Sequence, residues 1–480
     1  MTRRVLGPFN RVEGDLEVRI ESAGGAVAAA FVNSPLYRGF EHILRGKHPL
    51  DALVYAPRIC GICSVSQSLA AARVLAAAQG LRPVPNGRLA SDLTLAVENI
   101  SDHLSHFYLF FMPDFAKAVY ARESWYGDVA ARFRAMTGSA ASAYLAAHAE
   151  FKHMLGLLAG KWPHTLAIQP GGSTRALQGQ EIVRLLMILA SFRKFLEAVV
   201  YGSPLEQFAS IPSRSALDEW AQGSAGDLAR FWRLSQALDL KVLGRAEDRF
   251  LSYGSFGEDD ARLFRPGTYH HGRRADLNPA AITEDVSHSW LRQEEGPRHP
   301  FVGVTLPEVD RPGGYSWCKA PRLSGQVMEV GALARQVVDG QALALDLVEH
   351  EGGNVRSRVL GRFIEIARLI PAMEQWLKGL RPRDAFCETV AMPEEAEASG
   401  LVEAARGALG HWLRISKGHI FNYQIIAPTT WNFSPRDQDR KPGALEQALV
   451  GAPVRTGEDD PIAVQHIVRS FDPCMVCTVH

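Results

Sequence analysis

Two Cys-x-x-Cys pairs lie near opposite ends of this chain of 480 residues. Cys60 and Cys63 form the first pair, and Cys474 and Cys477 form the second, three residues before the terminal His480. The spacing within a pair lets both sulfurs point to one side of a turn, so two facing pairs offer four thiolates to one metal-sized space. The sequence therefore predicts a buried metal site that the fold assembles from both ends of the chain.

Two other kinds of site use the same cysteine pattern. A structural zinc site also binds two such pairs, although zinc ribbons usually separate the pairs by roughly 15 to 20 residues. A thioredoxin-like dithiol needs only one pair and leaves the other without a role. Because most of the chain separates the two pairs, we favour a different metal centre, and both alternatives stay open at this point.

The composition is that of a large globular protein, with 46% hydrophobic and 22% charged residues. Lys and Arg total 52, as do Asp and Glu, so the basic surplus typical of nucleic-acid binding is missing. The sequence has neither an apolar signal segment at its start nor a run of about 18 apolar residues. We therefore expect a cytoplasmic, soluble chain that binds no nucleic acid and has no direct membrane insertion.

Six cysteines are too few for a disulfide scaffold in a chain of this length, and four of them belong to the two pairs.

The first pair must be positioned by helices. An Ala- and Leu-rich stretch over about 50–80 carries this pair at its head, and 93–111 has the apolar spacing of a long buried helix. Similar stretches predict helices at 136–159, 179–201, 326–348 and 355–379.

Small β elements are predicted in two places. Apolar and charged residues alternate over 16–20, and a Gly-Gly turn predicts a hairpin that returns over 28–32. Between about 245 and 320, Gly, Pro, His and charged residues predict long loops with short strands. We therefore predict a mainly α (α+β) fold of one domain, 1–480, whose large helical-bundle core holds the buried site, with small peripheral β elements.

The cysteine pairs belong to two longer motifs, Arg58-Ile-Cys-Gly-Ile-Cys63 and Asp472-Pro-Cys-Met-Val-Cys-Thr-Val-His480. Seven other blocks occur between and before them: Arg11-Val-Glu-Gly14, Arg38-Gly-Phe-Glu41, Asp102-His103 with His106-Phe-Tyr108, Lys319-Ala-Pro-Arg322, Glu329-Val-Gly331, Arg406-Gly-Ala-Leu-Gly-His-Trp412, and Pro428-Thr-Thr-Trp-Asn432 with Ser434-Pro-Arg-Asp437. In this order, the motifs resemble the large (catalytic) subunit of nickel-iron hydrogenases along the full length of the chain.

The resemblance implies that Cys60, Cys63, Cys474 and Cys477 hold nickel. It also implies that Cys63 and Cys477 bridge to an iron that carries carbon monoxide and cyanide. Soft thiolates suit nickel, and a bimetallic site with an open position binds dihydrogen and makes its protons more acidic. The family glutamate that matches Glu13 passes these protons on, a role that a carboxylate among apolar neighbours suits. Without the resemblance, an exposed position on a strand is the alternative for Glu13.

Four polar residues are implied to surround the metals. Arg406 resembles the family arginine that overhangs them, and its fixed charge would polarise dihydrogen and donate to a cyanide. Thr430 matches a hydroxyl that binds the other cyanide, and Asp102 and Asp472 match carboxylates that hold Arg406 in place. Each of these residues is ordinary by itself, and only the ensemble is specific.

The resemblance implies a magnesium ion beside this centre. Its ligands would be Glu41, the carboxyl-terminal His480 and the main-chain carbonyl of Ile426. Oxygen ligands suit magnesium, although a histidine nitrogen is less usual for this ion. A surface position would explain Glu41 equally well by residue type.

The number of cysteines outside the two pairs predicts a partner subunit. Dihydrogen oxidation releases two electrons, and an iron-sulfur relay needs about four cysteines per cluster. Outside the two pairs only Cys318 and Cys387 remain, so we expect no iron-sulfur cluster in this chain. The resemblance implies that a small hydrogenase subunit carries the clusters and forms a heterodimer with this chain through a large interface.

Several positions depart from the common enzyme pattern. Gln67 and Asp15 stand where histidines are usual, and Ala405 replaces the proline before the overhanging arginine. Ile62 and Phe110 are bulkier than the usual Val and Leu. Larger side chains at the mouth of a gas path would hinder oxygen more than hydrogen, which would favour oxygen tolerance.

Together with a chain that stops at His480, Gln67, Ile62 and Phe110 resemble the hydrogen-sensing (regulatory) subgroup of the family. That resemblance implies a hydrogenase of low turnover that senses dihydrogen and signals through a partner histidine kinase. The alternative is the large subunit of an energy-conserving uptake hydrogenase. Two alternatives come from other classes of protein, namely a complex-I-like interaction subunit without metal and a structural zinc protein.

Overall fold

The computed structural model describes residues 2–292, 295–455 and 457–480. Its helices are α1 (Phe40–Leu44), α2 (Ala52–Tyr55), α3 (Ser64–Gln79), α4 (Pro85–Ser105), α5 (Tyr126–Phe133), α6 (Ser139–Ala159), α7 (Gly179–Phe195), α8 (Leu205–Ala209), α9 (Arg214–Gly223), α10 (Asp227–Ala237), α11 (Ala332–Asp339), α12 (Ala342–Glu351), α13 (Val355–Gly379), α14 (Pro428–Asn432), α15 (Ala444–Leu449), α16 (Ile462–Ser470) and α17 (Met475–Thr478). None of these described helices is long and apolar enough to cross a membrane.

The strands form five small antiparallel sheets. They are β1 (Thr2–Leu6), β2 (Glu17–Ala23) and β3 (Ala26–Asn33); β4 (Ile168–Gln169) and β5 (Gly172–Ser173); β6 (Arg249–Ser252), β7 (Gly267–His270) and β8 (Arg273–Ala275); β9 (Ile282–Asp285) and β10 (Ala320–Leu323); and β11 (Ala396–Ala404), β12 (Gly407–Ser416) and β13 (His419–Ile426). The predicted N-terminal hairpin is β2 and β3. The short strands β6 to β9 lie in the predicted loop region, and β10 begins at its end. Residues 293–294 of this region lie outside the described residues.

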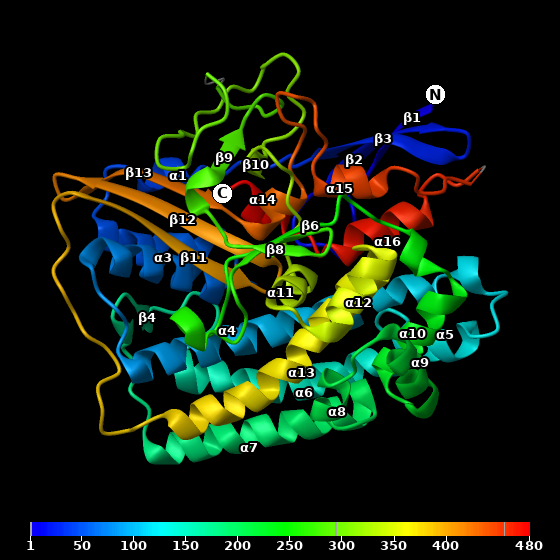
Figure 1. Ribbon diagram of the computed structural model, residues 1–480, viewed down its shortest axis with the longest axis horizontal. Helices are drawn as coiled ribbons and strands as arrows, with labels where there is room; N and C mark the ends of the chain where they lie inside the picture. The colour runs from blue at the N-terminus through cyan, green and yellow to red at the C-terminus, as the bar shows by residue number, and fades with distance from the viewer. Residues whose placement is uncertain (1, 293–294, 456) are drawn as a thin grey trace.

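The mainly helical α+β prediction is confirmed. In Figure 1, α13 runs diagonally through the helical part, between α11 and the lower helices α6 and α7. Residues 355–379 form α13 as predicted, because Asn354 accepts hydrogen bonds from the amides of Arg356 and Ser357 and so caps its first turn. The predicted helix at 93–111 is the end of α4 followed by a π-helical turn over His106–Phe111.

The single helix predicted over 326–348 is wrong. This stretch begins as irregular chain, and two separate helices, α11 and α12, follow. Gly331 has φ of 142° and Gly340 has φ of 89°, and both values lie outside the helical region. Glycine adopts such values without steric cost, so the two glycines start and end α11.

The sheet of β11, β12 and β13 is absent from the sequence prediction. It packs on α3, which Figure 1 shows as the blue helix beneath the orange strands. Seven consecutive residues of β12, Gly407 to Leu413, are buried, so the alternation that marks a half-exposed strand is missing. Gly400 of β11 lies so close to α3 that a Cβ there would stand 2.4 Å from the carbonyl oxygen of Ala70. The close approach therefore requires glycine at this position.

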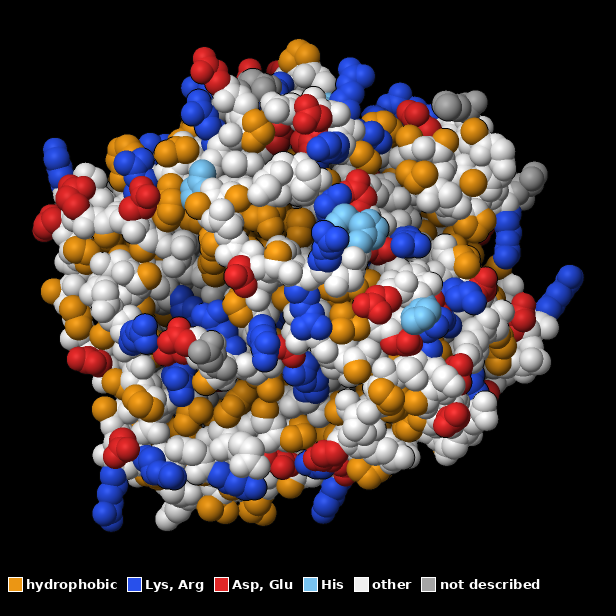
Figure 2. Space-filling model, in the orientation of Figure 1, with side chains coloured by type: hydrophobic (Ala, Val, Ile, Leu, Met, Phe, Trp, Pro, Cys, Tyr) orange, Lys and Arg blue, Asp and Glu red, His pale blue; other side chains and the backbone are white. Residues whose placement is uncertain are grey.

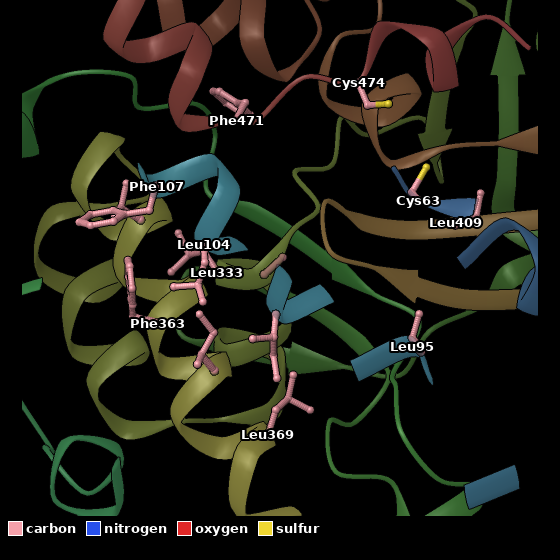
Figure 3. Packing of buried hydrophobic residues seen from close by; sticks show 14 of the residues in the cluster. Cys63, Leu95, Leu104, Phe107, Leu333, Phe363, Leu369, Leu409, Phe471 and Cys474 are labelled. Carbon is pink, nitrogen blue, oxygen red and sulfur yellow. The ribbon is translucent and has the colours of Figure 1, made fainter. Parts of the chain in front are cut away.

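One main cluster of buried apolar side chains contains residues from Leu6 to Cys477. Figure 3 shows Cys63 and Cys474 at one side of this cluster, with Phe107 and Phe363 at the other. On the face shown in Figure 2, acidic and basic side chains are interspersed, in agreement with the balanced totals of charged residues. The chain thus buries both cysteine pairs in its core.

Candidate metal centre

The fold brings the four paired cysteines together. The sulfur of Cys60 lies 3.5 Å from that of Cys474, and the sulfur of Cys63 lies 3.1 Å from that of Cys477. All four sulfurs lie within 4.8 Å of one another, and none of the four residues is more than 6% exposed. Among the described residues, this is the one group of three or more Cys, His, Asp or Glu side chains with metal-binding spacing.

The thiols in this cluster do not ionise independently. Hydrogen bonds to Cys474 raise the pKa of both Cys63 and Cys477, whereas hydrogen bonds from Cys474 and Cys477 lower the pKa of Cys60. Four thiolates at such short separations repel one another, because burial removes the water that would screen them. A bound cation relieves this repulsion, so the set fits a thiolate-liganded metal centre.

Arg38 joins the two cysteine segments. Its guanidinium donates to the carbonyl oxygen of Ile59, 2.6 Å away, and to that of Val476. These carbonyls directly precede Cys60 and Cys477 in the chain. One side chain therefore holds both halves of the site, a role that the sequence analysis did not assign to Arg38.

Arg406 lies in the turn between β11 and β12 and is 4% exposed. Its guanidinium forms two hydrogen bonds to Asp102, of 2.5 and 3.1 Å, one of 3.1 Å to the carboxylate of Asp472 and one of 2.9 Å to the Asp472 carbonyl oxygen. Burial by itself would lower the pKa of Arg406, but Asp102 and Asp472 raise it well above its usual value. The three predicted residues therefore form one buried, fixed charge network next to the cysteines.

A second buried arginine holds the turn that carries Arg406. Arg335 donates to the carbonyl oxygens of Ala404 and Ala405 at 2.8 and 3.0 Å, and to the carboxylates of Glu365 and Glu403 at 2.7 Å. The predicted residue Ala405 thus contributes its carbonyl to this turn. Charged residues among apolar neighbours, such as Arg335 in α11 and Glu365 in α13, were the sequence signal for this network.

Glu13 lies on a segment that pairs with the second cysteine motif. Its amide donates to the carbonyl oxygen of Pro473, and its own carbonyl oxygen accepts from the amide of Met475 at 2.7 Å. Burial and the neighbouring charge of Cys60 raise the pKa of its carboxyl, while Arg406 opposes this shift. Glu13 is half-buried beside the cysteines, in contrast to an exposed strand position.

Asp114, which the sequence analysis missed, anchors this segment. Its fully buried carboxylate pairs with Arg11, with Lys117 at 2.8 Å and with Arg469 at 2.6 Å. Arg469 in turn donates to the backbone carbonyl and side-chain oxygens of Asn10. One carboxylate therefore joins the chain before Glu13 to the helix α16 that leads into the second cysteine motif.

We expect Asp114→Asn to cost about 3 kcal/mol of folding free energy, because it leaves the buried Arg469 without its counter-charge. The measurement is the apparent melting temperature of the purified protein, which should fall. Asp128→Asn is the matched control, since Asp128 pairs with Arg230 at the surface, with its side chain 67% exposed. Equal melting temperatures for the two variants would contradict the anchoring role.

Two further predicted residues lie near the cysteines. Gln67 is fully buried on α3, and its carbonyl oxygen lies 2.9 Å from His411, whose other ring nitrogen contacts the hydroxyl of Tyr423 at 2.8 Å. The hydroxyl of Thr430 donates to the carbonyl oxygen of Thr478 at 3.3 Å. Gln67 thus connects the first cysteine helix to the β12–β13 pair, and Thr430 contacts the residue after Cys477.

Ile62 and Phe110 line the same cavity of about 120 Å³. Ile62 lies between the first two cysteines, and Phe110 lies on the π-helical turn that follows α4. Asp102, the partner of Arg406, also lines this space. Both bulky residues therefore line one cavity that borders the first cysteine pair at Ile62.

The predicted magnesium residues lie in a second, polar cluster. His480 contacts Glu41 at 3.1 Å and the carbonyl oxygen of Cys477 at 3.0 Å. The amide of Ile425 donates to Glu41 at 2.8 Å, and Ile426 follows as the last residue of β13.

The sequence analysis did not place Lys319 in this cluster. Its ammonium lies 3.5 Å from Glu41, 3.1 Å from Glu284 and 2.6 Å from the side-chain oxygen of Gln424. Burial would raise the pKa of Glu41, but Lys319 and His480 lower it to about 2. The cluster therefore presents ionised and neutral oxygens, of the kind that suits magnesium, around the ammonium of Lys319.

Comparison with known proteins agrees with this geometry. The family model described as nickel-dependent hydrogenase matches residues 38–142 and 139–480. The periplasmic [NiFeSe] hydrogenase large subunit of Desulfomicrobium baculatum is 30% identical, over 99% of this chain and 94% of that protein. The uptake hydrogenase large subunit of Azotobacter chroococcum mcd 1 is 28% identical, over 100% of this chain and 95% of that protein.

The fold agrees as well. The structure of the H2-activated [NiFeSe] hydrogenase of Dm. baculatum superposes with a TM-score of 0.88 and 28% sequence identity, and the match covers 100% of both chains. Sequence and fold thus correspond over the whole length, including the segments that carry both cysteine pairs. This chain belongs to the nickel-dependent hydrogenase family.

Proposed function

We propose that this chain is the catalytic large subunit of a nickel-iron hydrogenase that oxidises dihydrogen in an uptake role. The observation that carries the proposal is the cluster of four buried sulfurs beside the Arg406 network. The relatives named above are periplasmic and uptake enzymes, which supports uptake over sensing. Nickel would be held by Cys60, Cys63, Cys474 and Cys477.

The proposed roles follow from where each side chain lies. When bound, a nickel-iron centre supplies an open position at which dihydrogen becomes more acidic. Arg406, fixed by Asp102 and Asp472, holds a positive charge beside the sulfurs and needs no reorganisation during the reaction. Glu13 accepts a proton near Cys60, a role that its raised pKa favours.

We also propose the finer composition of the centre. Cys63 and Cys477, whose sulfurs lie 3.1 Å apart, would bridge to an iron carrying carbon monoxide and cyanide. Arg406 and Thr430 would donate to the cyanides. Magnesium would be bound by Glu41 and His480, with the Ile426 carbonyl as a third ligand.

A small subunit with iron-sulfur clusters would take the electrons. In the described part of the chain, the two cysteines outside the centre do not belong to its four-sulfur cluster: Cys318 is buried and donates to the carbonyl oxygens of Lys319 and Thr430, and Cys387 is half-buried. Neither residue belongs to a second group of metal-ligand type among the described residues. We propose that electrons leave this chain to a carrier in the partner.

Hydrogen sensing is the second candidate, because Ile62 and Phe110 both line the cavity beside the cysteines. As a sensor, the complex would turn over slowly and signal to a histidine kinase. Addition of dihydrogen distinguishes sensing from uptake, since an uptake enzyme reduces an electron acceptor continuously, whereas a sensor changes the phosphorylation of its kinase.

We also propose a cytoplasmic location, which fractionation of the host cell tests.

Metal content and an infrared spectrum of the purified complex test the proposed function. We expect one nickel and about one iron in this chain, with infrared bands of bound carbon monoxide and cyanide in a region free of protein absorption. Zinc alone, or no metal after expression in a host with the maturation proteins, would overturn the assignment and favour the zinc or complex-I-like alternatives.

The bulky cavity residues lead to a separate prediction. Replacing Ile62 by Val and Phe110 by Leu is expected to increase the rate at which oxygen inhibits dihydrogen oxidation, because both changes widen the same cavity. The rate of inhibition is measured at fixed oxygen concentration. Unchanged inhibition in the double variant would show that these two side chains do not restrict oxygen.

A further inference from the structure

The cavity beside the cysteines continues outward. The inner cavity, of about 120 Å³, has a mainly apolar lining, and Ile62 is one of its lining residues. A second cavity, of about 450 Å³ and more open, is lined by residues of α6 and by Arg184 of α7. Three residues line both cavities, namely Lys152, Leu155 and Trp162. These residues therefore form the boundary between the outer space and the inner one.

Two of the shared residues contact each other at this boundary. The ammonium of Lys152 lies 3.5 Å from the centre of the Trp162 ring, a short cation–π contact. The indole N–H of Trp162 donates to the carboxylate of Glu98 at 3.3 Å. The indole is thus held on one face by a cation and at its edge by a carboxylate.

Glu98 is itself rigidly placed. It is 3% exposed and accepts hydrogen bonds from the amides of Val65 and Ser66, of 2.8 and 2.9 Å, at the start of α3. The hydroxyl of Ser66 also donates to it, at 2.8 Å. The helix that begins directly after Cys63 therefore fixes the carboxylate that positions the Trp162 ring.

We propose that Lys152 and Trp162 form an outer gate on the path by which dihydrogen reaches the cysteine cluster, ahead of Ile62 and Phe110. This inference rests on the proposed function. An apolar gas partitions into the mainly apolar inner cavity, and to enter from the outer cavity it passes the boundary that these two side chains form. Movement of the indole away from Lys152 and Glu98 breaks two contacts, so the gate slows the entry of any gas. The entry of a larger gas molecule is slowed more strongly than that of dihydrogen.

The test is the entry of carbon monoxide into the metal-loaded heterodimer, followed by infrared spectroscopy after flash photolysis. Trp162→Ala removes the indole, and we expect carbon monoxide to rebind from solution several-fold faster, with a lower KM for dihydrogen and unchanged kcat. Lys152→Met removes the cation and keeps the chain length, so we expect a smaller change in the same direction. Leu157→Ala, which alters only the outer cavity, is the control and should leave the rates unchanged.

Xenon binding supplies a readout that does not depend on activity. In crystals under xenon pressure, we expect the inner cavity of Trp162→Ala to fill at a lower pressure than that of the unaltered protein. Equal carbon monoxide entry and equal xenon occupancy in Trp162→Ala and the unaltered protein would overturn the gate. Absence of the intrinsic carbon monoxide and cyanide bands from the unaltered complex would instead overturn the proposed function, so the two failures are distinguishable.

Discussion

Cys477→Ser is expected to abolish nickel incorporation and dihydrogen oxidation. The sulfur of Cys477 lies 3.1 Å from that of Cys63 and 3.0 Å from that of Cys474, at the centre of the buried cluster. A serine hydroxyl is a harder ligand than a thiolate and stays protonated at neutral pH, so it neither suits nickel nor adds the required negative charge. Metal analysis of the purified variant should give nickel at background level, with no hydrogenase activity.

Cys318→Ser is the matched control for this variant. Cys318 is also fully buried, but its thiol donates to the carbonyl oxygen of Lys319, a bond that a serine hydroxyl can keep. We expect this variant to retain nickel and activity. Full nickel content in Cys477→Ser, or equal losses in both variants, would contradict the assignment of Cys477 as a ligand.

Glu13→Gln is expected to retain the metals and to slow hydrogen/deuterium exchange by about 10²- to 10⁴-fold, the usual contribution of a positioned acid or base. The glutamine side chain has the same size as that of glutamate. The hydrogen bonds of residue 13 to Pro473 and Met475 use only backbone atoms, so the substitution leaves them in place. Only the capacity to take up a proton beside Cys60 is lost. The exchange of deuterium gas with water is measured under anaerobic conditions, together with nickel content and the infrared spectrum.

Glu21→Gln provides a control in the same N-terminal region, since Glu21 lies on β2, where it pairs with Arg3 of β1 and Ala29 of β3. Its exchange rate should equal that of the unaltered protein. If Glu13→Gln exchanges at the unaltered rate while its infrared spectrum is normal, another group takes the proton. A disturbed spectrum would instead assign Glu13 a role in forming the centre.

Several features of the fold and site were readable from the sequence because their signals are local. The helix α13 has an Asn cap and a continuous apolar pattern, and the hairpin of β2 and β3 has alternation and a glycine turn. The central strand β12 of the sheet of β11 to β13 had no such signal, since burial on both faces removes the alternation of apolar and polar residues. The helix predicted over 326–348 was wrong because glycine conformation, more than apolar spacing, sets its boundaries.

Residues that act through distant contacts were the hardest to predict. Asp114 is an ordinary acidic residue in the sequence, yet it pairs with Arg469, 355 positions away. Arg38 and Arg335 likewise act through backbone carbonyls, which every residue has, so no residue pattern marks their partners. The two cavities that meet at Trp162 depend on the packing of α6 against α4 and on the loop that follows α6, and neither is visible in a linear pattern.

The sequence by itself determined which thiols could share a metal, because cysteines separated by two residues present their sulfurs together wherever the turn lies. It also determined the family, through motifs whose residue types and order are fixed along the chain. Only the tertiary structure decided that Cys63 meets Cys477, 414 positions away, that Asp102 pairs with Arg406, and that Lys152 and Trp162 separate two cavities. These contacts join segments far apart in the chain, and they form only when the apolar core closes and excludes the water that would otherwise solvate each charge.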